Sequence, residues 1–105
     1  MLSLRQEAGR WLRARREEAG LSQRDLSRAL DLDYYTFISQ IEAGRGRVPP
    51  SQYVAMASAL RIEPHDFAKA MLRLYDPITH DMLFGATAST RLPSRRQGAA
   101  ARSLD

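Results

Sequence analysis

The stretch from Leu21 to Pro50 constrains the fold most, because its apolar residues form two short helical patterns separated by a turn. Ser22 with Asp25 three residues later has the spacing of a capping box, which marks the start of a helix. The turn is expected at 31–33, since Asp enters left-handed backbone conformations more readily than most residues. Gly44 is expected to end the second pattern. The chain is therefore expected to centre on two helices joined by a turn.

The first of these helices is predicted to run for about nine residues from Ser22, too short to be stable without packing. The second is predicted over 34–43, with Asp33 as its cap. Ser27 offers a small side chain where a neighbouring helix can approach closely. By periodicity, the predicted buried residues are Leu26, Ala29 and Leu30 in the first helix, and Tyr34, Ile38 and Ile41 in the second.

Three further helices are predicted around this centre. The first begins after Ser3 and ends near Gly20, and the others cover 51–60 and 64–75. Glu63 followed by Pro64 is a typical helix start. The expected inward residues are Trp11, Tyr53, Val54, Ala57, Leu60, Phe67, Met71, Leu72 and Leu74. The fold class is therefore all-α, a bundle of about five helices.

The apolar segment Ile78–Phe84 follows an Asp-Pro pair that should end the fifth helix. Its length suits either a strand or one helical turn. It can close the core, or it can pair two protomers or bind a partner. We expect residues 1–85 to form the folded domain. Residues 86–105 are rich in Ala, Ser and Arg and are predicted to be a disordered basic tail.

The net charge of +4 is concentrated toward the two ends of the chain. Residues 1–30 hold seven arginines against four acidic residues, and residues 91–105 hold four arginines against one. A basic balance permits nucleic acid as a partner without requiring it. The tail either adds nonspecific attraction to DNA or only keeps the protein in solution.

Enzyme chemistry finds little support in the sequence. The chain has no cysteine, and His65 and His80 lack metal-ligand spacing with other residues. Gly44 and Gly46 follow a predicted helix and precede Pro49, so they do not form a phosphate-binding loop. We predict no catalytic residue, no cofactor and no metal site. We also expect no secretory leader and no membrane span.

Several motifs occur together and in order between Leu12 and Ile62. They are Leu12 with Arg16, Gly20-Leu21-Ser22-Gln23, Leu26-Ser27 with Leu30, Ile38 with Ile41-Glu42-Ala43-Gly44, a proline five residues after Gly44, and Ala57-Ser58-Ala59-Leu60. This combination resembles the Cro/C1-type (XRE) helix-turn-helix family of bacterial and phage regulators. The resemblance implies a lambda repressor-like fold of about five helices and sequence-specific binding to double-stranded DNA. The stretch 33–50 also resembles regulators of phage-derived gene clusters in GC-rich bacteria.

The resemblance further implies a structural ion pair between Arg16 and Glu42 that sets the angle of the helix at 34–43. Counting back from Glu42 and forward from Gln23 gives registers that differ by one residue. The turn within 31–34 therefore holds one residue more than the family pattern. We keep the register anchored at Glu42, because it leaves Ile38 and Ile41 buried.

In this register the helix at 34–43 is the expected reader of the major groove, and its first turns reach base edges. Gln40 can pair bidentately with adenine, and the Tyr35 ring can pack on a thymine methyl or its hydroxyl can reach a phosphate. Arg45 and Arg47 follow the helix and should reach the backbone, or else form a solvated loop. The predicted base contacts are Tyr35, Thr36, Ser39 and Gln40. The predicted phosphate contacts are Gln23, Arg24, Arg45 and Arg47.

The expected function is a transcriptional regulator that binds as a homodimer to a near-palindromic site, in the cytoplasm of a bacterium and associated with the nucleoid. RNA polymerase or another regulatory protein is a further expected partner. The alternative is a protein-interaction module, such as an antitoxin or a polymerase-recruiting adaptor, with DNA binding secondary. Exposed aromatic residues and the segment Ile78–Phe84 motivate that alternative.

Overall fold

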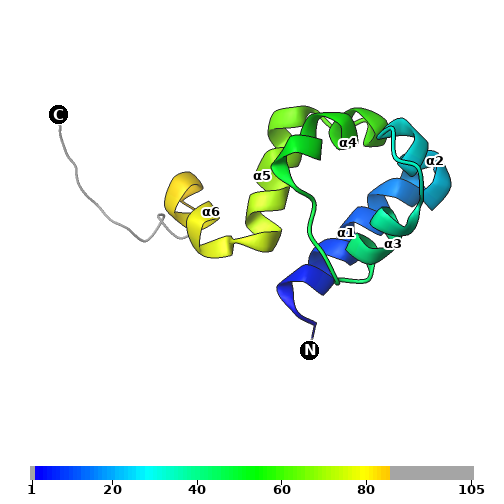
Figure 1. Cartoon of the computed structure of the whole chain (residues 1–105). Coiled ribbons are helices and arrows are strands. Elements are labelled where there is room, and N and C mark those ends of the chain that lie inside the picture. The colour runs from blue at the N-terminus through cyan, green and yellow to red at the C-terminus, as the bar shows by residue number, and fades with distance from the viewer. Residues whose placement is uncertain (1, 86–105) are drawn as a thin grey trace, which may run out of the picture.

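The computed structural model describes residues 2–85, and these residues contain six α-helices, one short 3-10 helix and no strand (Figure 1). The all-α class is therefore as predicted, with one helix more than expected. None of the described helices is long and apolar enough to cross a bilayer. In chain order the elements are α1 (Leu4–Glu18), α2 (Gln23–Ala29), α3 (Thr36–Glu42), η1 (Pro50–Gln52), α4 (Tyr53–Leu60), α5 (Pro64–Tyr75) and α6 (Pro77–Phe84).

Side-chain caps fix where α1, α2 and α5 begin. The Ser3 hydroxyl accepts the Gln6 N–H, and the Gln6 side chain accepts the Ser3 N–H in return. Ser22 and Asp25 form the same reciprocal pair at α2, as predicted. The Glu63 carboxylate accepts the Asp66 N–H, with a proline at the start of α5. Each cap satisfies backbone donors that a helix end leaves unpaired.

The core gathers residues from all helices except α6. The Phe67 ring lies at its centre, with ring centroids 6.1 Å from Trp11 and 5.6 Å from Tyr53. Trp11, which was expected to face inward, is partly buried against this core. The fully packed members are Ala8, Leu12, Leu26, Leu30, Ile38, Ile41, Val48, Met56, Ala57, Leu60, Phe67, Met71 and Tyr75.

Helix α1 crosses the end of α3 at very close range. A Cβ added at Gly9 would lie 2.3 Å from the Glu42 carbonyl oxygen, so only glycine fits there. Gly44 has φ +82°, and a Cβ at this position would lie 2.9 Å from the Gln6 Cα. Both glycines therefore permit backbone contact between α1 and the C-terminal end of α3.

The start of the second central helix differs from the prediction. Helix α3 begins at Thr36 and ends at Glu42, and Asp33 does not cap it, because Tyr35 occupies the N-cap position without a side-chain hydrogen bond. Tyr34 was predicted to be buried, but it is 76% exposed. The buried Ser27 hydroxyl donates to the Tyr34 carbonyl at 2.9 Å, which holds this residue outside the helix. The turn includes Asp31 with φ +59°, as its residue type favours.

Two other predicted core positions are wrong. Val54 is 68% exposed, because α4 follows a 3-10 turn and turns Met56, Ala57 and Leu60 inward instead. Ala29 is exposed, since Leu26 and Leu30 occupy the inward face of α2. Met56, Val48 and Tyr75 are core residues that the sequence pattern missed, with 1%, 0% and 8% of their surface exposed.

The segment Ile78–Phe84 is neither a strand nor a single turn, because Pro77–Phe84 is an eight-residue helix. The Asp76 carboxylate accepts the Thr79 N–H, so the Asp-Pro pair that ends α5 also begins α6. Ile78, Met82 and Leu83 are 74%, 79% and 66% exposed. Helix α6 therefore packs on α5 without closing the core, and His80 is its buried residue. The predicted tail 86–105 lies outside the described residues.

Candidate nucleic-acid interface

Helices α2 and α3 lie beside α1, away from α6, which packs on the far end of α5 (Figure 1). Helix α3 has only seven residues, so its position depends on its contacts. Its apolar face holds Ile38 and Ile41, which are 2% and 3% exposed. The opposite face is therefore the one available to a partner.

A buried ion pair joins α1 to the last residue of α3. Arg16 donates to Glu42 from Nε at 2.6 Å and from Nη2 at 3.1 Å, and the two side chains are 9% and 6% exposed. Arg16 Nη1 also donates to the Leu21 carbonyl at 2.8 Å. The hydrogen bonds to Glu42 raise the pKa of Arg16, although burial acts to lower it. The pair implied by the family resemblance is thus present and bidentate.

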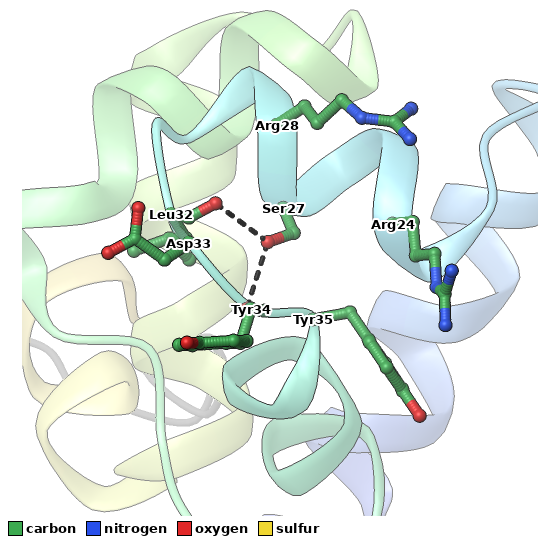
Figure 2. A pocket seen from close by; sticks show the side chains of 7 residues that line it. All are labelled: Arg24, Ser27, Arg28, Leu32, Asp33, Tyr34 and Tyr35. Carbon is green, nitrogen blue, oxygen red and sulfur yellow. Dashed lines mark hydrogen bonds between the residues drawn. The ribbon is translucent and has the colours of Figure 1, made fainter.

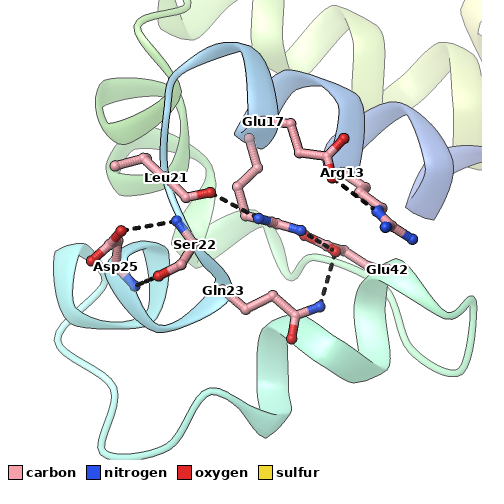
Figure 3. Close-up of polar contacts among 8 residues, drawn as sticks. Arg13, Glu17, Leu21, Ser22, Gln23, Asp25 and Glu42 are labelled. Carbon is pink, nitrogen blue, oxygen red and sulfur yellow. Dashed lines mark hydrogen bonds and ion pairs between the residues drawn. The ribbon is translucent and has the colours of Figure 1, made fainter.

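Gln23 extends this pair into α2 (Figure 3). Its side-chain Nε2 donates to Glu42 Oε1 at 3.1 Å, so one carboxylate receives donors from both α1 and α2. The Gln23 amide has a second N–H that this bond does not use. Glu42 therefore ties three helices together, and Gln23 is positioned beside α3 at the start of α2.

The four predicted base-reading residues gather at the outward side of α3. Thr36 and Gln40 are exposed and Ser39 is partly exposed, opposite Ile38 and Ile41. Thr36, Ser39 and Gln40 are three and four residues apart, which places them on one helix face. Tyr35 precedes the helix and is 40% exposed. The result is a short polar face with an aromatic ring at its N-terminal end.

A pocket of about 340 Å³ opens between α2 and the turn before α3 (Figure 2). The Arg24 guanidinium carbon lies 5.0 Å from the centroid of the Tyr35 ring, which is cation–π distance. The pocket is lined by Arg24, Ser27, Arg28, Leu32, Asp33, Tyr34 and Tyr35. Two arginines and two tyrosines thus line a pocket beside the N-terminal end of α3.

The basic loop after α3 is partly fixed by α5. The Arg47 guanidinium carbon lies 4.4 Å from the centroid of the Tyr75 ring. The Tyr75 hydroxyl accepts the buried Val48 N–H at 3.1 Å, and burial raises the pKa of Tyr75. Arg45 is exposed. Sequence reasoning missed Tyr75 as the anchor of this loop, since the contact joins residues 27 positions apart.

Each of the two histidines lies beside acidic side chains. Ligand atoms of Glu63, His65 and Asp66 lie within 4.8 Å of one another, but all three residues are exposed. Glu63 caps α5, which accounts for its position. His80 Nδ1 lies 3.3 Å from Asp81 Oδ1, and its ring packs 5.1 Å from Phe84. The His80 contacts hold its ring against α6.

Comparison with protein families agrees with this geometry. The family model described as "Helix-turn-helix domain" matches residues 7–70, which is more than half of the chain and runs from α1 into α5. No curated protein matches the chain. The matched range includes the ion pair, both central helices and the turn between them, as the resemblance to Cro/C1-type regulators implies. The chain belongs to the helix-turn-helix domain family.

Proposed function

We propose that this protein is a sequence-specific DNA-binding regulator of transcription that reads the major groove with α3. The main support for this proposal is that contacts with α1 and α2 fix the orientation of α3. Its apolar face is buried, Glu42 is held by Arg16 and Gln23, and Thr36 and Gln40 are exposed. A helix held rigidly with a polar face outward suits base reading, because specificity requires fixed donor and acceptor positions.

Each predicted base contact has a matching chemistry. The Gln40 amide can donate to N7 and accept from N6 of adenine, a pairing worth about 1–3 kcal/mol of discrimination. Thr36 and Ser39 hydroxyls can donate or accept. The Tyr35 ring can pack on a thymine methyl group. These four side chains are exposed or partly exposed together.

Backbone phosphates would be contacted on both sides of this face. Gln23 and Arg24 lie in the first turn of α2, where backbone N–H groups also favour an anion. Arg45 and Arg47 follow α3, and the Arg47 guanidinium carbon lies 4.4 Å from the centroid of the Tyr75 ring. Phosphate contacts of this kind fix the register of the protein on DNA and are sensitive to salt.

A homodimer would place two copies of α3 on the half-sites of a near-palindrome, about 34–36 Å apart. Helix α6 is our proposed contact, because Ile78, Met82 and Leu83 are exposed apolar residues and the helix lies away from α3 (Figure 1). We further propose a bacterial, nucleoid-associated regulator. The resemblance of 33–50 to regulators of phage-derived gene clusters supports such a cluster as its target.

The exposed face of α6 also supports a second candidate function. In this alternative the protein is mainly an interaction module, an antitoxin or an adaptor for RNA polymerase, and α6 binds the partner. Partner capture compared with DNA retardation at physiological salt separates the two functions. Tight capture combined with sequence-blind, salt-sensitive DNA binding would favour the alternative.

The proposed function is tested by selecting bound duplexes from a randomised pool and footprinting the resulting site. Wild type should yield one preferred sequence, and Gln40→Ala should lose preference at one position. Arg45→Ala should weaken all sequences alike and reduce the slope of log affinity against log salt by about one. Ser58→Ala, an exposed change on α4, is the control and should alter neither. An unchanged footprint in both Thr36→Ala and Gln40→Ala would show that α3 is not the reading helix.

A further inference from the structure

Two consecutive tyrosines before α3 are held very differently. Tyr34 is 76% exposed, and its backbone carbonyl is fixed by the Ser27 hydroxyl at 2.9 Å. Tyr35 is 40% exposed, and the Arg24 guanidinium lies over its ring at 5.0 Å. The two rings point in different directions from the same turn (Figure 2). Only the second of them is both at the N-cap of α3 and covered by a cation.

The contact between the Arg24 guanidinium and the Tyr35 ring, at 5.0 Å, does not use the N–H donors of Arg24 in a hydrogen bond. A guanidinium is planar, and its five N–H donors lie in that plane, so covering a ring with its face does not use them. Arg24 lies in the first turn of α2 and is exposed. Its edge can therefore donate to a phosphate while its face orients an aromatic ring.

The surroundings restrict Tyr35 in two independent ways. The Ser27 hydroxyl, itself buried, fixes the backbone of the residue immediately before it. The Arg24 guanidinium lies 5.0 Å from the ring centroid, and both residues line the pocket of about 340 Å³ between α2 and the turn, so the ring is contacted from the α2 side. Ring direction decides which part of the groove the hydroxyl and ring edge can reach. If the ring direction is fixed before binding, less side-chain entropy is lost when the protein binds DNA.

We propose that Arg24 is a positioning residue for Tyr35, and that their stack makes Tyr35 a determinant of base specificity at the α2 side of the reading face. This role of Arg24 rests on the proposed function. It adds a contribution of Arg24 to base specificity beside the contribution of its charge to phosphate binding. The pair acts as one unit, in which phosphate binding by the Arg24 edge and base reading by Tyr35 are coupled through the stack.

The test uses the full chain and the duplex selected by wild type, with each base pair changed in turn. Arg24→Lys keeps the positive charge but removes the planar face. It should keep the salt slope and reduce discrimination at one position by up to about fivefold, because a lysine ammonium can still approach the ring but presents no planar group to orient it. Tyr35→Ala should affect that same position. In the double variant Arg24→Lys should add nothing, because the ring it orients is gone.

Arg28→Lys is the matched control. Arg28 lines the same pocket and is exposed, but it pairs with Asp25 at 3.3 Å and sits one turn further along α2. This change should leave discrimination at the Tyr35 position unchanged. Unchanged discrimination in Arg24→Lys, or an equal loss in Arg28→Lys, overturns the inference while the proposed function stands. A wild type that selects no preferred sequence overturns the proposed function, and the inference with it.

Discussion

Two arginines contact the two ends of α3, and their surroundings are opposite. Arg16 reaches Glu42, the last residue of the helix, through a bidentate contact that is almost fully buried. Arg24 covers Tyr35, the residue before the helix, at an exposed position. Breaking a buried pair leaves an uncompensated charge and is costly, whereas an exposed contact contributes little to stability. We infer that the buried Arg16 contact serves stability, whereas the exposed Arg24 contact serves base reading.

The largest effect is expected from Glu42→Ala. This change leaves the buried Arg16 guanidinium without its carboxylate and Gln23 without its acceptor. The free energy of unfolding should fall by about 3–5 kcal/mol in urea denaturation.

Glu17→Ala is the matched control for that experiment. Glu17 also accepts from an arginine, Arg13 Nε at 3.3 Å, but the two side chains are 56% and 64% exposed. Its loss should cost less than about 0.5 kcal/mol. Equal losses of unfolding free energy in the two variants would contradict the claim that the buried pair contributes more to stability than the exposed pair.

Gly9→Ala should also weaken the buried end of α3. The new Cβ would lie 2.3 Å from the Glu42 carbonyl oxygen, so α1 and α3 must move apart. Although Ala is normally the better helix former, we expect a loss of about 1–3 kcal/mol in thermal or urea unfolding. At Gly46 an added Cβ meets nothing within 4 Å, so Gly46→Ala should be nearly neutral. A Gly9→Ala protein as stable as wild type contradicts the close crossing.

At the exposed end, Arg24→Ala should hardly change stability. The cation–π contact to Tyr35 is exposed and contributes about 0.5–1 kcal/mol. Unfolding by urea should therefore show a loss of about 1 kcal/mol or less, while binding to the selected duplex weakens. If Arg24→Ala lowered the free energy of unfolding as much as Glu42→Ala, the two arginine contacts would not have separate roles.

The smallest effect is the pH dependence at the start of α2. Hydrogen bonds from the backbone and side chain of Ser22 lower the pKa of Asp25 from its ordinary value of 3.8. The stabilisation is therefore complete above that value and is lost as pH falls through the lower pKa of the folded state. Asp25→Asn should lose less stability than wild type as the pH falls below about 3.8. Parallel losses in the two proteins would assign the acid sensitivity to other carboxylates, such as Asp76, whose pKa is also lowered.

Features with local causes were predictable from the sequence. The capping box at Ser22, the cap at Glu63 and the helix-ending glycines depend on residues a few positions apart, and the structure contains them. The buried positions Ile38 and Ile41 followed from helical spacing. The Arg16–Glu42 contact came from family resemblance, since nothing local joins residues 26 positions apart.

Features with tertiary causes were not predictable. The hydrogen bond from Ser27 that leaves Tyr34 outside α3 forms only when α2 and the turn meet. Glycine is a poor helix former, so the sequence alone gives no reason for Gly9 inside α1. The reason is the close contact with the backbone of α3. The Asp-Pro pair before α6 can end one helix and begin another, and the sequence around it fits both. The roles of Tyr35, Thr36, Ser39 and Gln40 on DNA stay predictions.

The most direct test of the reading helix is a backbone amide NMR titration of the full chain with the duplex that wild type selects. We predict large shift changes at Tyr35, Thr36, Ser39 and Gln40, and smaller ones at Arg24 and Arg45, the proposed contacts to the DNA backbone. Residues of α6 should shift only if DNA binding changes how two copies pair. Large changes confined to α6, with α3 unperturbed by the duplex, would contradict the claim that α3 reads DNA.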